Sequence, residues 1–249
     1  MQISAHIEAI EEHAAALGAA AGKAGLDAAV PDCPGWDVRA LLAHIGMVHR
    51  WAAAHVREGS AAVAGGRQPR PEPAPVDGLL DWFAEGHHAL VAALRSAPAD
   101  IDSWTFLRGA GSPLAFWARR QAHETAIHRA DAEAALGSVP GYDAAFAADG
   151  LDELIRGFMG RRGGRLYADP ARSVLVRPTD ADGRWHLAIG PDSRTISVGG
   201  AEPADCTLSG RAADLYLLLW NRQPAGMPSV AGDQGVLELW RERANITWR

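Results

Sequence analysis

Two hydrophobic patterns divide this chain of 249 residues, and they constrain its fold more than any other feature. In the first part, apolar side chains recur every three or four residues, which predicts amphipathic helices that pack against one another. Such stripes indicate helices over residues 3–21 and from about 37, and a third helix is expected over about 77–97. Ser112-Pro113 supplies an N-cap and a proline at the first helical position, which predicts a fourth helix over 113–137. The sequence therefore predicts an N-terminal four-helix bundle.

The pattern changes after a turn-rich stretch, Arg161-Arg162-Gly163-Gly164. Beyond it, short apolar runs alternate with Asp-Gly and Pro-Asp turns, which is typical of a β-meander. We expect strands at 173–177, 185–189, 195–198 and 204–209, and helices at 211–220 and 232–243. This second part is expected to be a small α+β unit.

The predicted fold class is therefore α+β, with two domains. The helical domain is expected to span residues 1–162, including a connecting helix near 143–160, and the α+β domain residues 163–249. Glycine and proline residues between positions 59 and 78 predict a long surface loop inside the first domain.

Charge and composition exclude several functional classes. The net charge is −6 and the sequence pI is about 5.9, without a long basic run, which argues against a nucleic-acid binder. No segment has the roughly 18 consecutive apolar residues of a membrane helix, and the N-terminus lacks a basic segment before an apolar stretch. We therefore expect a cytoplasmic protein whose partners are small molecules, not nucleic acid or membranes.

The two cysteines, Cys33 and Cys206, lie far apart and form no CxxC motif. This spacing argues against a disulfide framework and against a thiolate zinc site. Any bound metal is then expected to use nitrogen and oxygen ligands.

The strongest chemical signal lies on the helix predicted over 113–137. Glu124 and His128 are four residues apart, so their side chains share a helix face, where a carboxylate oxygen and an imidazole nitrogen can bind one cation. The metalloprotease motif HExxH is excluded because position 127 is Ile. By itself such a pair is weak evidence, since most Glu/His pairs on helices are solvated or only hydrogen-bonded.

His44 is the natural candidate for a third ligand, because it falls in the apolar sector of the second predicted helix, between Leu41 and Val48. The alternative is a hydrogen-bonded core histidine. Together with Glu124 and His128 it would form a two-histidine, one-carboxylate set, which suits zinc or another divalent metal and leaves positions open for water or substrate. His123 points to a different face and is expected to be structural or exposed.

The sequence resembles the mycothiol-dependent maleylpyruvate isomerases, which are relatives of the DinB-like metalloenzymes. The resemblance rests on two motifs and covers nearly the whole chain: Val30-Pro31-Asp32-Cys33-Pro34-Gly35-Trp36-Asp37-Val38-Arg39 with Leu41-Leu42-Ala43-His44, and His123-Glu124-Thr125-Ala126-Ile127-His128-Arg129-Ala130-Asp131-Ala132-Glu133. It implies a DinB-like four-helix bundle in which His44, Glu124 and His128 bind a divalent metal, commonly zinc. It also implies that the C-terminal domain is sterol-carrier-like.

The resemblance implies mycothiol as the thiol cofactor or co-substrate. A cation favours the thiolate form of a thiol, which otherwise titrates near pH 8.5. Addition of that thiolate to a cis double bond, rotation and elimination would isomerise an unsaturated acid and regenerate the thiol. A mycothiol S-transferase would use the same metal and thiol, so both activities remain open. Two further alternatives are a thiol-independent metal hydrolase and a non-catalytic small-molecule-binding protein.

Two more residues are candidates for supporting roles. Arg222 ends a predicted helix and resembles a family arginine that could bind a substrate carboxylate, although a cation at a helix C-terminus is an equal alternative. Asp131, three residues after His128, could orient the imidazole of that histidine, or could form only a surface contact.

Overall fold

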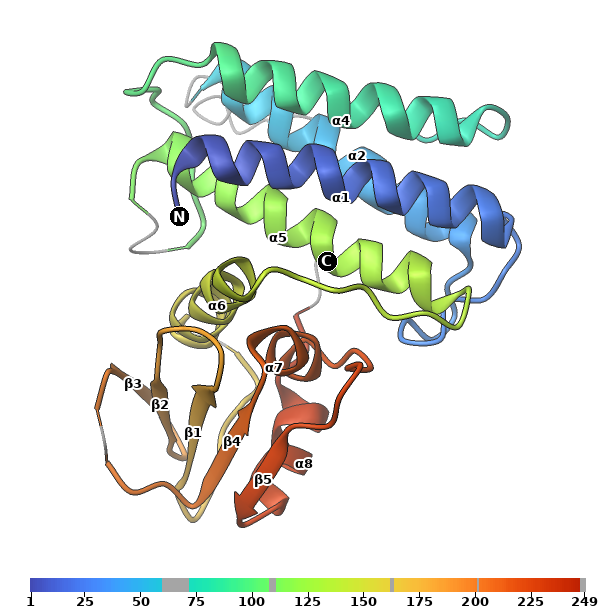
Figure 1. The fold of residues 1–249 in the computed structure, drawn as a ribbon. Coiled ribbons are helices and arrows are strands. Elements are labelled where there is room, and N and C mark those ends of the chain that lie inside the picture. Colours follow the sequence, from blue (N-terminus) through green and yellow to red (C-terminus); the bar gives the residue numbers. More distant parts are fainter. Residues whose placement is uncertain (60–71, 108–110, 162–163, 201, 247–249) are drawn as a thin grey trace. The chain divides into compact units, whose positions relative to one another are not determined.

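The computed structural model describes the chain except for residues 60–71, 108–110, 162–163, 201 and 247–249. The chain divides into two compact units, Met1–Pro140 and Gly141–Arg249. The first is helical and the second contains a five-stranded sheet, so the predicted α+β class is confirmed (Figure 1).

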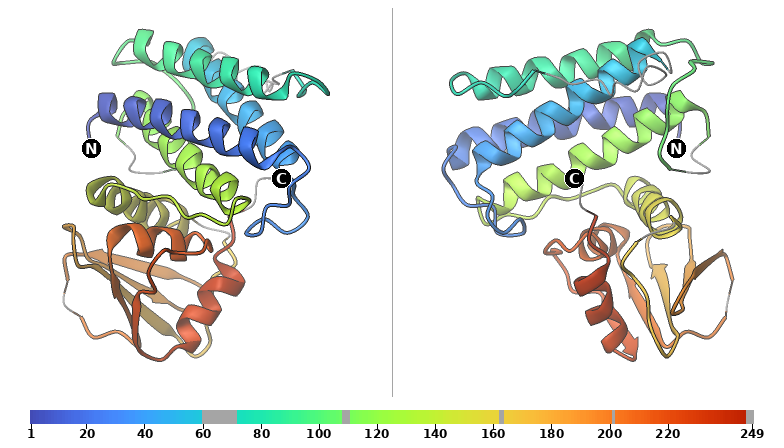
Figure 2. Two further views of the ribbon diagram at one scale, coloured as in Figure 1. Left: turned by 45° about the vertical axis from the view of Figure 1, so that its right-hand side comes forward. Right: turned by 180° about the vertical axis from the view of Figure 1, so that it is seen from behind.

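The first unit is the predicted bundle. Its long helices are α1 (Ile3–Ala24), α2 (Val38–Glu58), α4 (Leu79–Ser96) and α5 (Pro113–Ala134). Helix α1 packs mainly against α5, and α2 packs mainly against α4 and also contacts α5, as Figure 2 shows from two sides. Most of the loop expected between 59 and 78 lies outside the described residues.

Local sequence signals fix where the two most important helices begin. At α2, the Asp37 carboxylate accepts a hydrogen bond from the Ala40 amide at 2.7 Å, the usual contact of an N-cap aspartate. At α5, the Ser112 hydroxyl caps the Ala115 amide at 3.2 Å and Pro113 occupies the first helical position. These caps set which residues of α2 and α5 turn inward.

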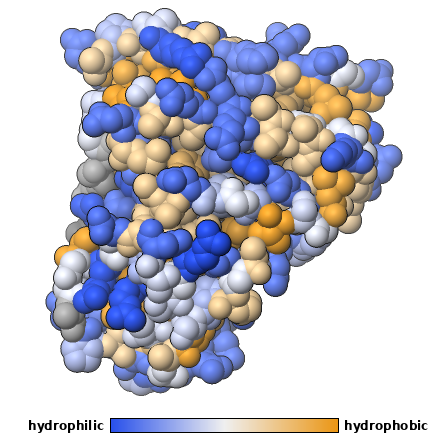
Figure 3. Space-filling view, in the orientation of Figure 1, coloured by the Kyte–Doolittle hydropathy of each residue, from blue (hydrophilic) through white to orange (hydrophobic). Residues whose placement is uncertain are grey.

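The bundle core is built from the apolar stripes read in the sequence. Leu17, Leu41, Leu42, Ile45 and Phe83 are all buried to 1% exposure or less. On the face shown in Figure 3, polar and charged residues are spread over the outer sides of α1 and α4 among scattered apolar ones. This division between faces is what an amphipathic helix packed on a core requires.

No helix in the described part of the chain is long and apolar enough to cross a membrane.

The second unit is organised around a sheet of order β3-β2-β1-β4-β5. Helix α7 contacts β1 and β4, α8 contacts β1, and the π-helix η1 contacts β3. The elements in chain order are α6 (Ala144–Asp152), η1 (Glu153–Met159), β1 (Arg172–Pro178), β2 (Trp185–Ile189), β3 (Arg194–Val198), β4 (Cys206–Gly210), α7 (Ala212–Leu219), β5 (Ser229–Gly232) and α8 (Gly235–Arg243).

The expected β-meander holds only for the first three strands. Strands β1, β2 and β3 pair antiparallel in sequence order, but β4 pairs parallel to β1 on its other side. Strand β5, absent from the sequence prediction, pairs antiparallel to β4. Its segment Ser229-Val230-Ala231-Gly232 is short and mostly exposed, so it carries no apolar alternation that sequence reading could detect.

The division between the units lies after Pro140, whereas the sequence predicted a boundary after residue 162. The predicted connecting helix, observed as α6 followed by η1, belongs to the second unit because its aromatic side chains pack there. The rings of Tyr142 and Phe146 contact Tyr216 of α7, and Phe158 contacts Trp220. The turn-rich stretch at 161–164 therefore lies within the second unit.

A buried histidine joins two helices of the bundle. His49 on α2 is fully buried, and its Nε2 lies 2.9 Å from the Thr125 hydroxyl oxygen on α5. The Thr125 hydroxyl donates a hydrogen bond to the Gln121 carbonyl at 2.6 Å. It therefore accepts a hydrogen bond from the Nε2–H group of His49. Burial, together with the nearby His87 imidazole, lowers the pKa of His49 to about 3, so the ring is neutral in the folded protein.

This depressed pKa makes His49 a source of acid sensitivity. The imidazole takes up a proton near pH 6.5 when unfolded but only near pH 3 when folded, so its stabilisation is complete above pH 6.5 and is lost as pH falls toward 3. We expect His49→Gln, which keeps an N–H donor but does not titrate, to reduce the pH slope of unfolding free energy by up to about 1.4 kcal/mol per pH unit.

The measurement is urea unfolding between pH 7.5 and 4.5, with a chelator present. The matched control is His88→Gln, because His88 is an exposed histidine of α4. Equal slopes for the wild type and His49→Gln would contradict this account of His49.

Candidate metal centre

The structure brings His44, Glu124 and His128 together. His44 lies in the second turn of α2, and Glu124 and His128 lie one helical turn apart on α5. The His44 Nε2 atom is 3.6 Å from Glu124 Oε1, and the His128 Nε2 atom is 3.4 Å from the same oxygen. The three candidate ligand atoms all lie within 4.8 Å of one another.

These spacings fit a shared cation better than hydrogen bonds. Both distances exceed the 2.7–3.2 Å of ordinary N–H···O bonds. Ligand atoms held about 2.1 Å from a tetrahedral metal lie roughly 3.4 Å apart, close to the observed separations. The side chains of His44, Glu124 and His128 are 20%, 10% and 11% exposed. The donor set therefore fits a divalent metal, and its binding there stays a prediction.

Arg120 holds the other oxygen of Glu124. Its Nη2 donates to Glu124 Oε2 at 3.0 Å from one turn earlier on α5, and its side chain is only 2% exposed. Burial alone would raise the pKa of Glu124, but the His128 and His44 imidazoles and the Arg120 guanidinium lower it well below its usual range. Glu124 is thus ionised and presents Oε1 to the histidines.

Asp131 holds the outer nitrogen of His128. The Asp131 Oδ2 atom lies 2.8 Å from His128 Nδ1, and the aspartate side chain is fully buried. This contact orients the ring so that Nε2 points toward Glu124 and fixes the tautomer that a metal would use. Burial lowers the pKa of His128, but the contacts with Asp131 and Glu124 raise it to about 9. Without a metal, His128 is an imidazolium at neutral pH.

Trp36 borders the site. Its ring centroid lies 5.0 Å from that of His44 and 6.3 Å from that of His128, nearly parallel to the latter at 11°. The turn before α2 places it there, through the hydrogen bonds from the Trp36 amide to the Cys33 carbonyl at 2.9 Å and from the Val30 amide to the Trp36 carbonyl at 3.0 Å. Gly35 permits this turn because its φ is +87°.

Sequence reading missed the roles of Arg120 and Trp36. A signal for Arg120 was present, since it lies four residues before Glu124, the spacing of a helical ion pair. For Trp36 the sequence held no comparable signal, because a tryptophan beside a turn more often packs in a core than borders a site. Its ring does pack on the bundle core, and it flanks both histidines as well.

Arg222 belongs to the second unit, two residues after the C-cap of α7. Its guanidinium donates to the Trp220 carbonyl at 2.8 Å, and its amide donates to the Leu217 carbonyl at 2.8 Å. These contacts are those of a cation at a helix C-terminus. Its suggested role toward a substrate carboxylate stays a prediction.

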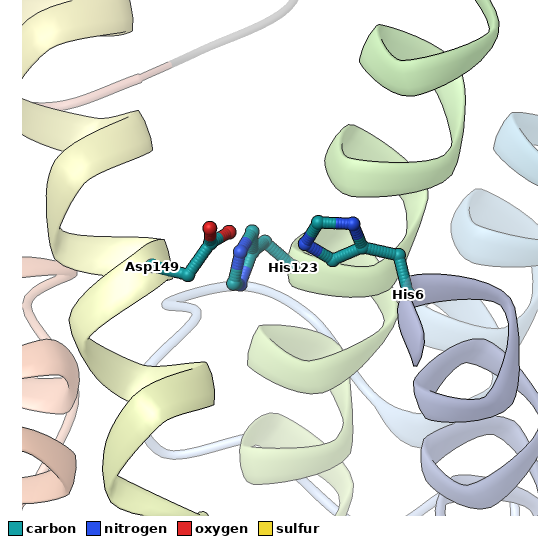
Figure 4. Close-up of side chains that lie close together, drawn as sticks. All are labelled: His6, His123 and Asp149. Atoms are coloured by element: carbon teal, nitrogen blue, oxygen red, sulfur yellow. The ribbon is translucent and has the colours of Figure 1, made fainter. Parts of the chain in front are cut away.

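A second pair of histidines lies elsewhere in the bundle. His6 of α1 and His123 of α5 are both buried, and their ring centroids are 6.0 Å apart in an edge-to-face arrangement (Figure 4). His123 was expected to be structural or exposed, and the structure shows that it is buried. Asp149, also drawn in Figure 4, belongs to the second unit.

Two family models match the chain. One, described as the mycothiol maleylpyruvate isomerase N-terminal domain, matches residues 7–133, and the other, described as the MDMPI C-terminal domain, matches residues 145–239. No curated protein sequence matches the chain.

Two solved structures share the fold over 93% of this chain and 93% of their own. A crystal structure of the mycothiol-dependent maleylpyruvate isomerase is 12% identical with a TM-score of 0.57. A crystal structure of a histidine-to-alanine mutant of the mycothiol-dependent maleylpyruvate isomerase is 11% identical with a TM-score of 0.56. Since the first family model alone covers more than half of the 249 residues, the chain belongs to the mycothiol maleylpyruvate isomerase family.

Proposed function

We propose that this protein is a metal-dependent enzyme that uses mycothiol on a small electrophilic or unsaturated acid. The observation that carries the proposal is the convergence of His44 Nε2, His128 Nε2 and Glu124 Oε1 at mutual spacings suited to one dication, which we take to be zinc. Family membership supports mycothiol as the thiol. Proteins with the same fold are named as mycothiol-dependent maleylpyruvate isomerases.

The bound dication would supply one chemical effect, which is to lower the pKa of a thiol that reaches it, so that the nucleophilic thiolate is present at neutral pH. The side chains of α2 and α5 prepare the site. Arg120 keeps Glu124 ionised and fixes its orientation, and Asp131 fixes the His128 ring with Nε2 inward. With three ligands from the described residues, a bound metal would keep a position for an exchangeable group, unlike in a structural zinc site.

The preferred reaction is a maleylpyruvate isomerase-like cis–trans isomerisation, in which the thiol adds to a conjugated double bond and is later eliminated. In this scheme Arg222 would bind a carboxylate of the substrate through its planar guanidinium. A mycothiol S-transferase is the second candidate, since it requires the same metal and thiol. The two activities differ in whether the thiol is returned.

The first prediction concerns metal content. Removing one ligand from a three-ligand site leaves two, too few to retain zinc through purification. We expect the wild type to hold about one equivalent of zinc by elemental analysis and His44→Ala to hold less than a tenth of that, as expected when a ligand is lost. The control His88→Ala, on exposed α4 surface, should match the wild type. Equal zinc in the wild type and His44→Ala would contradict the ligand assignment.

The second prediction concerns the protonation of His128. In the chelated, metal-free protein its imidazole should titrate near pH 9, as followed by histidine NMR resonances. Asp131→Asn removes a contact that raises this pKa, so the titration should move toward the ordinary value near 6.5. A wild-type titration at or below pH 6.5 would show that the pairing with Asp131 and Glu124 does not exist in solution.

The third prediction separates the two reactions. With zinc-loaded enzyme, mycothiol and a cis-unsaturated diacid such as maleylpyruvate, an isomerase should form the trans product while free thiol, measured by a colorimetric reagent, stays constant. An S-transferase should consume one thiol for each product formed. Product formation at the same rate without any thiol would contradict thiol dependence and indicate a metal hydrolase or another thiol-independent enzyme.

A further inference from the structure

The second unit contains a cavity of about 270 Å³ that the proposed reaction does not use. Its walls come from the end of η1, the chain just after it, the first residue of β3, the last residue of α8 and the segment that follows α8. The volume is just below the usual range of ligand pockets, which begins near 300 Å³, and thus suits a small molecule.

Four arginines line this cavity: Arg161, Arg165, Arg194 and Arg243. Its described lining residues include no aspartate, glutamate or histidine. A local cluster of four positive charges is notable in a chain whose net charge is −6. Such a one-signed lining attracts anions.

Arg194 holds a fixed positive charge in the wall. Its half-buried guanidinium donates to the carbonyls of Met159 at 2.7 Å and Leu166 at 2.9 Å, and to that of Arg161, and it lies over the Tyr167 ring. In the described part of the chain, no carboxylate pairs with it. The guanidinium is therefore held in place by neutral oxygens, and its charge is left uncompensated.

Arg165 and Arg243 supply exposed donors around the same cavity. Arg165 is exposed and forms no hydrogen bond or ion pair with any described residue. Arg243 is also exposed, and its contacts are long, 3.4 Å to the Tyr167 carbonyl and 3.9 Å to Glu242. Both guanidiniums are free to turn toward a ligand without breaking strong bonds.

The remainder of the lining is largely apolar. Phe158, Met159, Leu166 and Ala244 are all buried and contribute to the wall. An apolar wall beside several guanidiniums suits a molecule with an apolar body and an anionic group, since arginine forks pair with carboxylates and phosphates.

We propose that this cavity binds a small organic anion, in which a carboxylate or phosphate ester is attached to an apolar group. The proposal does not depend on the metal site, because every residue of the cavity belongs to the second unit. It assigns the second unit a binding role of its own.

The test is calorimetric titration of the full chain with four probes at low ionic strength. Benzoate and phenyl phosphate should bind with dissociation constants on the order of 1 mM or lower, and the tighter of the two identifies the preferred anionic group. Benzyl alcohol, which lacks the charge, and inorganic phosphate, which lacks the ring, should each bind at least roughly tenfold more weakly than the better probe. If either of these binds as well as the better probe, the proposal is overturned.

Variants locate the binding. Arg165→Ala should weaken binding of the better probe several-fold. The double variant Arg165→Ala/Arg243→Ala should weaken it roughly tenfold or more, since each charged contact contributes to affinity. The control Arg177→Ala removes an exposed arginine of β1 outside the cavity and should have no effect. His44→Ala should bind the better probe with the same affinity as the wild type, which would exclude the candidate metal centre as the binding site of that probe. Absence of binding, or affinity unchanged in the double variant, would overturn the proposal.

Discussion

A row of buried ionisable groups along one face of α5 is the constraint on which the site depends. Arg120, Glu124, His128 and Asp131 follow one another at intervals of four, four and three residues, and each contacts the next. Isolated charges at such depth would cost many kcal/mol of desolvation energy. Their signs alternate, so that each charge is paired and the row is neutral when His128 is protonated.

This row also explains how the protein could exchange a proton for a metal. A dication bound at Nε2 of His128 would replace the imidazolium proton, and Glu124 and Asp131 would continue to balance the local charge. His44 completes the set from α2. The hydrogen bond between His49 of α2 and Thr125 of α5 ties the same two helices together beside the site. This core contact thus helps to set the distance between the candidate ligands on α2 and α5.

Much of the fold could be read from the sequence because amphipathic periodicity reports which helix face is buried. The start of α5 at the Ser112 cap and the inward placement of His44 follow from local rules. The spatial meeting of His44 with Glu124 and His128 could not be derived from periodicity, which does not fix how α2 crosses α5. That step rested on a family resemblance.

Other features were inaccessible to sequence reading for physical reasons. The parallel pairing of β4 with β1 joins segments 32 residues apart, and no local signal encodes such a contact. The expected boundary and the division into compact units differ because a run of arginines and glycines at 161–164 resembles a linker in sequence. Contacts of Tyr142 and Phe158 with α7 and its C-cap assign the preceding helix to the second unit. The i,i+4 spacing of Arg120 and Glu124 is visible in the sequence, but only the packing of the helices shows that this ion pair is buried.

The central claim is that one dication is held by His44, Glu124 and His128. Anomalous diffraction from crystals grown with zinc, recorded on both sides of the zinc absorption edge, tests it most directly. The account predicts one strong peak within about 2.0–2.2 Å of His44 Nε2, Glu124 Oε1 and His128 Nε2. A peak located elsewhere, such as beside His6 and His123, with none at these three atoms, would contradict it.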